Sequence, residues 1–171
     1  AGYPNGFETG MDCTTDRYVN DGRICQAVVA MLAKVGIKVN LLAQPRLKYF
    51  AKILGPGYNT SFYMLGWTPA NYDVHNAFVS LLHSRDPASH KGDFNVGGWS
   101  NKAFDDLTDK MASETDHAKR NQEIAEAQKI FKDEMPTIPL HQQQIIWAMR
   151  KNIDVIPMAD NEFPLRLVTV K

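Results

Sequence analysis

The sequence lacks several features that would point to particular classes of protein. It has no net charge, because 19 Lys and Arg residues balance 19 Asp and Glu residues. No overall field therefore favours nucleic acid or an anionic membrane surface. No apolar run approaches the roughly 20 residues that are needed to cross a bilayer. We therefore expect a small molecule as the partner, with no nucleic acid and no membrane span.

Motifs that carry cofactors or covalent chemistry are also missing. No Gly-x-x-x-x-Gly-Lys-Ser/Thr or Gly-x-Gly-x-x-Gly sequence follows an expected strand, so the usual phosphate cradles are absent. No Gly-x-Ser-x-Gly elbow presents a serine nucleophile. No two histidines have the spacing of metal ligands; the five are His75, His83, His90, His117 and His141. We expect no cofactor, no metal site and no enzyme activity.

Cysteine is scarce, and the two that occur, Cys13 and Cys25, are too few for a structural zinc site. Cys13 ends an expected strand, and Cys25 lies in the first turn of the expected helix that follows. Packed against each other, they would lie within bridging reach. We favour a disulfide over two buried free thiols; it would close a loop of about a dozen residues and add roughly 3 kcal/mol. The bridge implies an oxidising compartment.

Hydrophobic periodicity predicts strands that alternate with helices in the first half of the chain. Apolar residues at spacings of three and four indicate a helix that Gly36 ends. In the next helix we expect Leu47, Phe50 and Leu54 to face inward. The expected strands are residues 7–13, 37–41 and 60–66, and the expected helices are residues 21–35, 46–54 and 73–83. This alternation predicts an α/β fold with a mostly parallel β-sheet flanked by helices.

The second half of the chain is expected to be mainly helical. Residues 84–100 are polar and rich in glycine, which is typical of a long surface loop that closes against another part of the molecule. Ser100 is expected to cap one helix, and Thr115 or Asp116 another that ends before Pro136. Two weaker strand candidates follow, residues 140–149 and 163–170. We expect one domain that spans residues 1–171.

Two of the expected strands end at the same edge of the sheet, where ligands of open α/β sheets bind. Arginine can hold a carboxylate through two hydrogen bonds, tryptophan can stack on an apolar body, and an aspartate can meet a donor. The residues that follow these strands are Arg17 and Tyr18 after the first, and Trp67, Asn71, Tyr72 and Asp73 after the third. They predict a site for a small ligand that carries a carboxylate.

Other interpretations of these residues remain open. Arg17 would have a purely structural role if it paired with Asp12, Asp16 or Asp73 while Trp67 filled the core. A small α/β enzyme would place Asp73 or a histidine in a catalytic pair at the same edge. An interaction module acting through residues 84–100 would need a large apolar patch on that loop.

Short motifs in a fixed order resemble the family 5 extracellular solute-binding proteins, which serve ABC importers for dipeptides, oligopeptides, nickel complexes and related solutes. The motifs cover nearly the whole chain: residues 2–7 (GYPNGF), 16–21 (DRYVND), 35–39 (VGIKV), 65–68 (LGWT), 99–101 (WSN), 104–107 (FDDL), 127–131 (AQKIF) and 135–140 (MPTIPL). The resemblance implies a substrate-binding component that captures a peptide or a related carboxylate-bearing solute and hands it to an ABC permease.

The same resemblance implies the carboxyl-terminal lobe, about a third of such a protein, with the fold of a type II periplasmic-binding-protein lobe. It also implies a periplasmic or extracellular location, including a lipid-anchored form. The chain opens without the basic and apolar segments of a signal peptide, as expected for the interior of a longer chain or a processed start.

Family residues carry over unevenly. Arg17 matches the arginine that meets the ligand carboxylate in dipeptide-binding members, and Trp67 matches the tryptophan that lines the cleft. Peptide binders usually place an aspartate three residues after this tryptophan to hold the amino terminus of the ligand. This chain has Ala70 there, with Asp73 three residues further on. We therefore expect a departure from standard dipeptide specificity.

Overall fold

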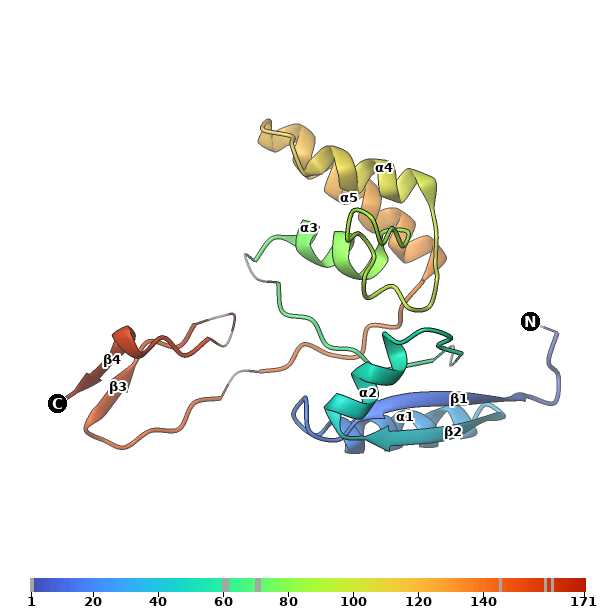
Figure 1. Ribbon diagram of the computed structural model, residues 1–171, viewed down its shortest axis with the longest axis horizontal. Helices are drawn as coiled ribbons and strands as arrows, with labels where there is room; N and C mark the ends of the chain where they lie inside the picture. Colours follow the sequence, from blue (N-terminus) through green and yellow to red (C-terminus); the bar gives the residue numbers. More distant parts are fainter. Residues whose placement is uncertain (1, 60–61, 70–71, 145, 159, 161) are drawn as a thin grey trace.

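A computed structural model describes residues 2–59, 62–69, 72–144, 146–158, 160 and 162–171. Its first part is a β-α-β unit, as the periodicity predicts, followed by a short helix (Figure 1). The two strands pair in parallel, from Phe7 opposite Ile37 to Thr14 opposite Gln44. The elements are β1 (Phe7–Thr14), α1 (Asp21–Ala33), β2 (Ile37–Gln44) and α2 (Arg46–Ile53).

The expected third strand is reduced to a single parallel bridge between Tyr63 and Asp12. The Asp12 N–H donates to the carbonyl of Phe62 at 2.9 Å, and the Met64 N–H donates to the carbonyl of Asp12 at 3.0 Å. Residues 60 and 61 lie outside the described part of the chain. Met64 is buried, so the apolar run marks a buried segment, but burial alone does not require a strand ladder. The fold is therefore α/β with a small parallel sheet flanked by helices.

The prediction for α2 is correct in its bounds but wrong in its buried face. Of the residues expected to face inward, Phe50 is half-buried, but Leu47 is 79% exposed and Leu54 is also exposed, whereas Tyr49 and Ile53 are fully buried. The Tyr49 hydroxyl donates to the carbonyl of Met64 at 2.6 Å, which satisfies the polar tip of this buried ring. A tyrosine with a hydrogen-bond partner thus anchors the helix in place of the leucines.

The second part of the chain is helical. The helix expected over residues 73–83 begins as α3 and continues as one π-helical turn, η1. Asp116 caps the last long helix as predicted, but Asn101 rather than Ser100 caps the helix before it, because its side chain accepts from the N–H of Phe104. The elements are α3 (Val74–Ala77), η1 (Phe78–Leu82), α4 (Lys102–Met111) and α5 (His117–Glu134).

Two hydrophobic clusters stabilise these two parts. The first, which we call the disulfide core, packs β1, β2 and α1 together, and Figure 1 shows it below the helical group. The second, the helical core, lies among η1, α4 and α5. The buried members of the disulfide core are Met11, Cys13, Cys25, Val28, Val39 and Met64. Those of the helical core are Phe78, Leu82, Phe104, Met111 and Ala127.

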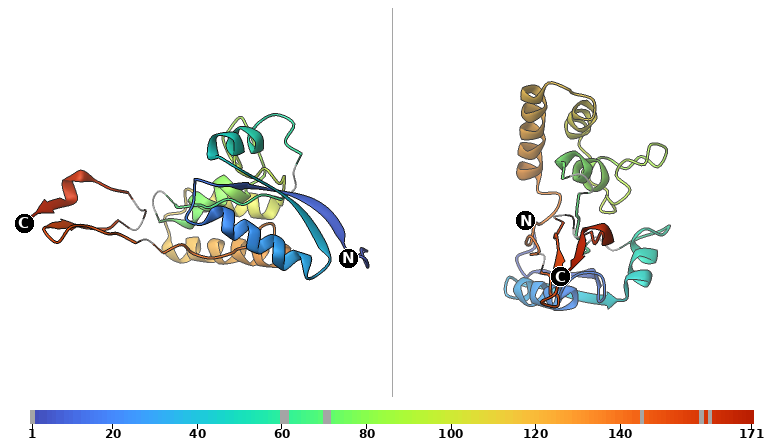
Figure 2. Two further views of the ribbon diagram at one scale, coloured as in Figure 1. Left: turned by 90° about the horizontal axis from the view of Figure 1, so that it is seen from below. Right: turned by 90° about the vertical axis from the view of Figure 1, so that its left-hand side faces the viewer.

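The last part of the chain is an extended arm that points away from both groups (Figure 1 and the left view of Figure 2). It ends in an antiparallel pair of short strands, β3 (Ile153–Val155) and β4 (Val168–Val170), with a 3₁₀ turn η2 (Leu165–Leu167) before β4. The strand expected at 163–170 is found only over β4, and β3 was not expected. The strand expected at 140–149 is wrong for its described residues, which are mostly exposed and have no partner strand.

Within the described residues, no helix is both long and apolar enough to cross a membrane.

Candidate ligand-binding site

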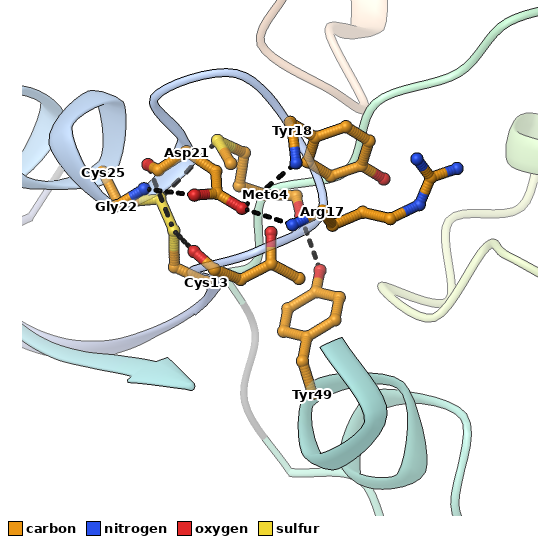
Figure 3. The surroundings of a disulfide bond; sticks show 9 residues. Cys13, Arg17, Tyr18, Asp21, Gly22, Cys25, Tyr49 and Met64 are labelled. Atoms are coloured by element: carbon orange, nitrogen blue, oxygen red, sulfur yellow. Dashed lines mark hydrogen bonds between the residues drawn. A yellow bond between two sulfur atoms is a disulfide. The ribbon is translucent and has the colours of Figure 1, made fainter. Parts of the chain in front are cut away.

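The loop between β1 and α1 carries the first two candidate residues, Arg17 and Tyr18, and a disulfide lies at its base (Figure 3). Cys13 and Cys25 are both fully buried, and their Cα atoms are 6.5 Å apart. This is the pair favoured from the sequence. The bridge ties the end of β1 to the first turns of α1, so the loop between them has two fixed ends.

A buried carboxylate organises the same loop from inside. One oxygen of Asp21 accepts from the backbone N–H groups of Arg17 at 3.0 Å and Tyr18 at 3.2 Å. The other oxygen accepts from the N–H of Gly22 at 2.8 Å. Burial acts to raise the pKa of Asp21, but hydrogen bonds, first among them that from the Arg17 N–H, outweigh it, and the pKa is lowered. Asp21 is therefore an ionised anchor for the loop.

Arg17 itself is exposed, and its guanidinium carbon lies 5.0 Å from the centre of the Tyr18 ring. Within the described residues the guanidinium has no ion pair. The acids that might have neutralised it contact other groups: Asp12 binds Lys52 at 2.7 Å, and Asp16 accepts from the N–H of Arg46 at 2.6 Å. The structure thus leaves a positive charge on a fixed loop.

The second stretch, residues 65–68, lies directly beside this loop. The Tyr18 hydroxyl donates to the carbonyl of Gly66 at 3.2 Å. A Cβ atom on residue 66 would lie only 2.8 Å from a carbon of the Tyr18 ring, so the position requires glycine for this close approach. The two strand ends expected at one edge are therefore in contact through Tyr18 and Gly66.

Trp67 is half-buried and is held by two residues that the sequence did not point to. Its indole N–H donates to the side-chain oxygen of Asn76 at 2.9 Å, and its ring lies 5.2 Å from the ring of Phe94 in an edge-to-face contact. Phe94 belongs to the polar 84–100 loop. An aromatic residue in such a loop is the sequence signal that could have indicated a buried contact. The Phe94 carbonyl also accepts from the Tyr63 hydroxyl at 3.3 Å. The expected closure of this loop against another part of the molecule is confirmed.

Asp73 contacts a partner far along the chain. Its carboxylate forms an ion pair with the Arg120 guanidinium, at 2.9 and 2.8 Å to the two oxygens, and it also caps α3 by accepting from the N–H of His75. The hydrogen bond from Arg120 and then that from His75 lower the pKa of Asp73. These contacts tie α3 to α5 and suit a structural anchor better than a catalytic base.

The other two candidates lie towards the extended arm. Tyr72 is 57% exposed, and its hydroxyl accepts from the N–H of Asp160 at 2.7 Å. Asn71 lies outside the described residues, as does Ala70. Within the described part of the chain, no group of three or more His, Cys, Asp or Glu side chains is arranged to hold a metal ion. The structure therefore brings Arg17 and Tyr18 beside Gly66, with Trp67 following at the same edge and Asp73 bound to Arg120.

Comparison with known proteins identifies binding proteins of transporters. No model of a protein family matches the chain. The glutathione-binding protein GsiB of Escherichia coli (strain K12) is 29% identical over 157 residues, which cover 90% of this chain and 30% of GsiB. This chain thus spans about a third of the length of the curated relatives that it matches.

Two solved structures share the fold. The ABC transporter-associated periplasmic binding protein DppA from Helicobacter pylori, in complex with the peptide STSA, has a TM-score of 0.66 and 28% identity, covering 79% of this chain and 25% of DppA. The dipeptide binding protein from Pseudoalteromonas sp. SM9913, in complex with Met-Leu, has a TM-score of 0.75 and 23% identity, covering 100% of this chain and 34% of that protein. All three relatives are named as binding proteins, in agreement with the expectation of a binding protein.

Proposed function

We propose that this chain belongs to the family 5 extracellular solute-binding proteins and forms one ligand-binding lobe of a longer receptor that delivers a solute to an ABC permease. The lobe is the carboxyl-terminal one, spans residues 1–171, and closes with a second lobe around the ligand. The receptor works in the periplasm or at the outer cell surface, where the Cys13–Cys25 disulfide is stable.

The exposed guanidinium of Arg17 is the observation that carries this proposal. It has no ion pair within the described residues, and its loop is held by a buried carboxylate and lies over a disulfide. An unneutralised guanidinium on a fixed loop suits a ligand carboxylate, which it can bind through two parallel hydrogen bonds. The ligand class that fits is a peptide, glutathione or a related compound with a free carboxylate.

The other candidate residues complete one wall of the site. Tyr18 and Trp67 offer aromatic faces to the apolar body of the ligand, and Tyr72 borders it. Asn71 is a further candidate from the sequence alone. Asp73 stabilises the lobe and is not part of the ligand contact, because its carboxylate is bound to Arg120 and to the N–H of His75 at the start of α3. Because Arg17 offers a positive charge and Asp73 is bound to Arg120, this lobe binds the carboxylate end of the ligand.

Titration calorimetry on the intact receptor tests this function. Reduced glutathione and the dipeptide Met-Leu are the probes, and the variants are Arg17→Ala and Trp67→Ala. We expect Arg17→Ala to weaken binding by about 2 kcal/mol, or roughly thirtyfold, since hydrogen bonds between charged groups contribute this much. Arg23→Ala, which removes an exposed arginine from α1, is the matched control and should bind normally. Full affinity in both site variants would contradict the assignment.

A further inference from the structure

Asp21, the first residue of α1, binds the backbone N–H of Arg17 and not its guanidinium. We propose that Asp21 is the positioning residue of the carboxylate site, holding the backbone of Arg17 and Tyr18 so that the guanidinium and the ring face the ligand. This inference rests on the proposed function and names a determinant of its specificity. Figure 3 shows the Asp21 carboxylate between the loop and the first turn of α1.

The geometry of Asp21 explains how an acid four residues from Arg17 leaves that arginine positive. Both carboxylate oxygens accept from backbone N–H groups: Arg17 and Tyr18 on one side and Gly22 on the other. Asp21 is only 3% exposed, so these donors surround it. It also lies at the amino terminus of α1, where the helix dipole favours a negative charge. The carboxylate therefore fixes the loop while the guanidinium stays available.

The loop that Asp21 holds also contacts Gly66, at the end of the expected third strand. Tyr18, whose N–H binds Asp21, donates its hydroxyl to the carbonyl of Gly66, and its ring lies where a Cβ of residue 66 would be. Trp67 is the next residue. A loop released from Asp21 would therefore lose the position of Arg17 and the contact between Tyr18 and residue 66 together.

The Asp21 carboxylate lies on tightly packed, buried groups. Asp21 is flanked by the buried Cys13–Cys25 bridge, and the sulfur atoms of Cys25 and Met64 are 3.5 Å apart. The carbonyl of Met64 accepts from the buried Tyr49 hydroxyl. Because these groups are fully or almost fully buried, the turn has little freedom to move as a whole. Small changes at Asp21 should thus act on the loop itself and leave the core in place.

The test compares acid and amide ligands on the intact receptor that carries Asp21→Asn. An asparagine can accept on one side only, because its NH₂ group would face either the N–H groups of Arg17 and Tyr18 or that of Gly22. Calorimetry measures the affinity for Met-Leu and for Met-Leu amide, which lacks the carboxylate. We expect the preference for the acid to fall about tenfold, because the acid loses its bond to Arg17 while the amide loses only the weaker contact with Tyr18. Asp16→Asn, which alters a neighbouring acid bound to the N–H of Arg46, should keep the preference.

A second measurement separates positioning from folding. Hydrogen exchange at the amides of Arg17 and Tyr18 should become faster in Asp21→Asn, while exchange in β1 stays slow. Equal losses of acid and amide binding, or an unchanged acid preference where Arg17→Ala abolishes it, would overturn the role of Asp21 and leave the proposed function standing. If the wild-type receptor binds neither probe, or binds acid and amide equally, both proposals fail.

Discussion

The two cores of this chain hold the candidate wall by different means. The disulfide core positions Arg17 and Tyr18 through a covalent bridge and a buried carboxylate whose partners are all local in sequence. The helical core positions its side through contacts between distant segments, such as the ion pair of Asp73 with Arg120. Two acids near one edge therefore have different effects: Asp21 leaves Arg17 free to meet a ligand, whereas Asp73 neutralises an arginine. The local contacts of Asp21 leave the charge of Arg17 available for a ligand, whereas the long-range contact of Asp73 neutralises Arg120.

Removing the Cys13–Cys25 disulfide should have the largest effect on stability, and the loss should be confined to the disulfide core. In the double variant Cys13→Ala/Cys25→Ala, the free energy of unfolding should fall by about 3 kcal/mol, because the unfolded chain loses a closed loop of about a dozen residues. Hydrogen exchange in increasing urea should show this loss in β1 and α1 but not in α4 and α5. Under denaturing, non-reducing conditions the wild type should have no free thiol. Two free thiols, or equal losses in both cores, would contradict the contrast.

Breaking the helical anchor should have a smaller effect and should spare binding. Asp73→Ala removes the cap of α3 at a cost of about 1 kcal/mol, and the partly exposed ion pair with Arg120 adds less than about 1 kcal/mol. Thermal unfolding of the intact receptor measures the loss, and calorimetry with Met-Leu should show an affinity close to that of the wild type.

The matched control for Asp73→Ala is Asp106→Ala, which breaks the highly exposed pair with Lys102 on α4 and should leave unfolding unchanged. A normal unfolding temperature combined with weak binding in Asp73→Ala would show instead that Asp73 contacts the ligand.

The difference between the two cores also explains what the sequence could predict. The Cys13–Cys25 bridge and the approach of the Arg17–Tyr18 loop to residue 66 follow from local rules, because cysteines next to one turn and parallel strands that end together leave few arrangements. The partner of Asp73 could not be found in this way, since Arg120 lies 47 residues away and no periodicity links them. Phe94 was hidden for the same reason. The third strand was overestimated because an apolar run records burial and not hydrogen bonding.

The contact between Tyr18, which packs on the disulfide core, and Gly66, which precedes Trp67, allows the smallest and most specific test of the comparison. Gly66→Ala places a methyl group closer to the Tyr18 ring than van der Waals contact allows, so the ring must move. The hydrogen bond from the Tyr18 hydroxyl to the carbonyl of residue 66 must then weaken. We expect a loss of about 1 kcal/mol in unfolding free energy, typical of mild overpacking. Gly22→Ala is the control: nothing lies near its added methyl group and the residue is helical, so the change should be neutral or slightly stabilising.

A double-mutant cycle then decides whether Tyr18 transmits this effect. In a Tyr18→Ala background the ring is gone, so Gly66→Ala should cost much less than about 1 kcal/mol if the clash is its cause. The same cost in both backgrounds would place the strain in the backbone of residue 66. In that case Asp21 and Tyr18 would order only their own loop, and the alignment of Trp67 with Arg17 would depend on Asn76 and Phe94 in the helical part of the chain.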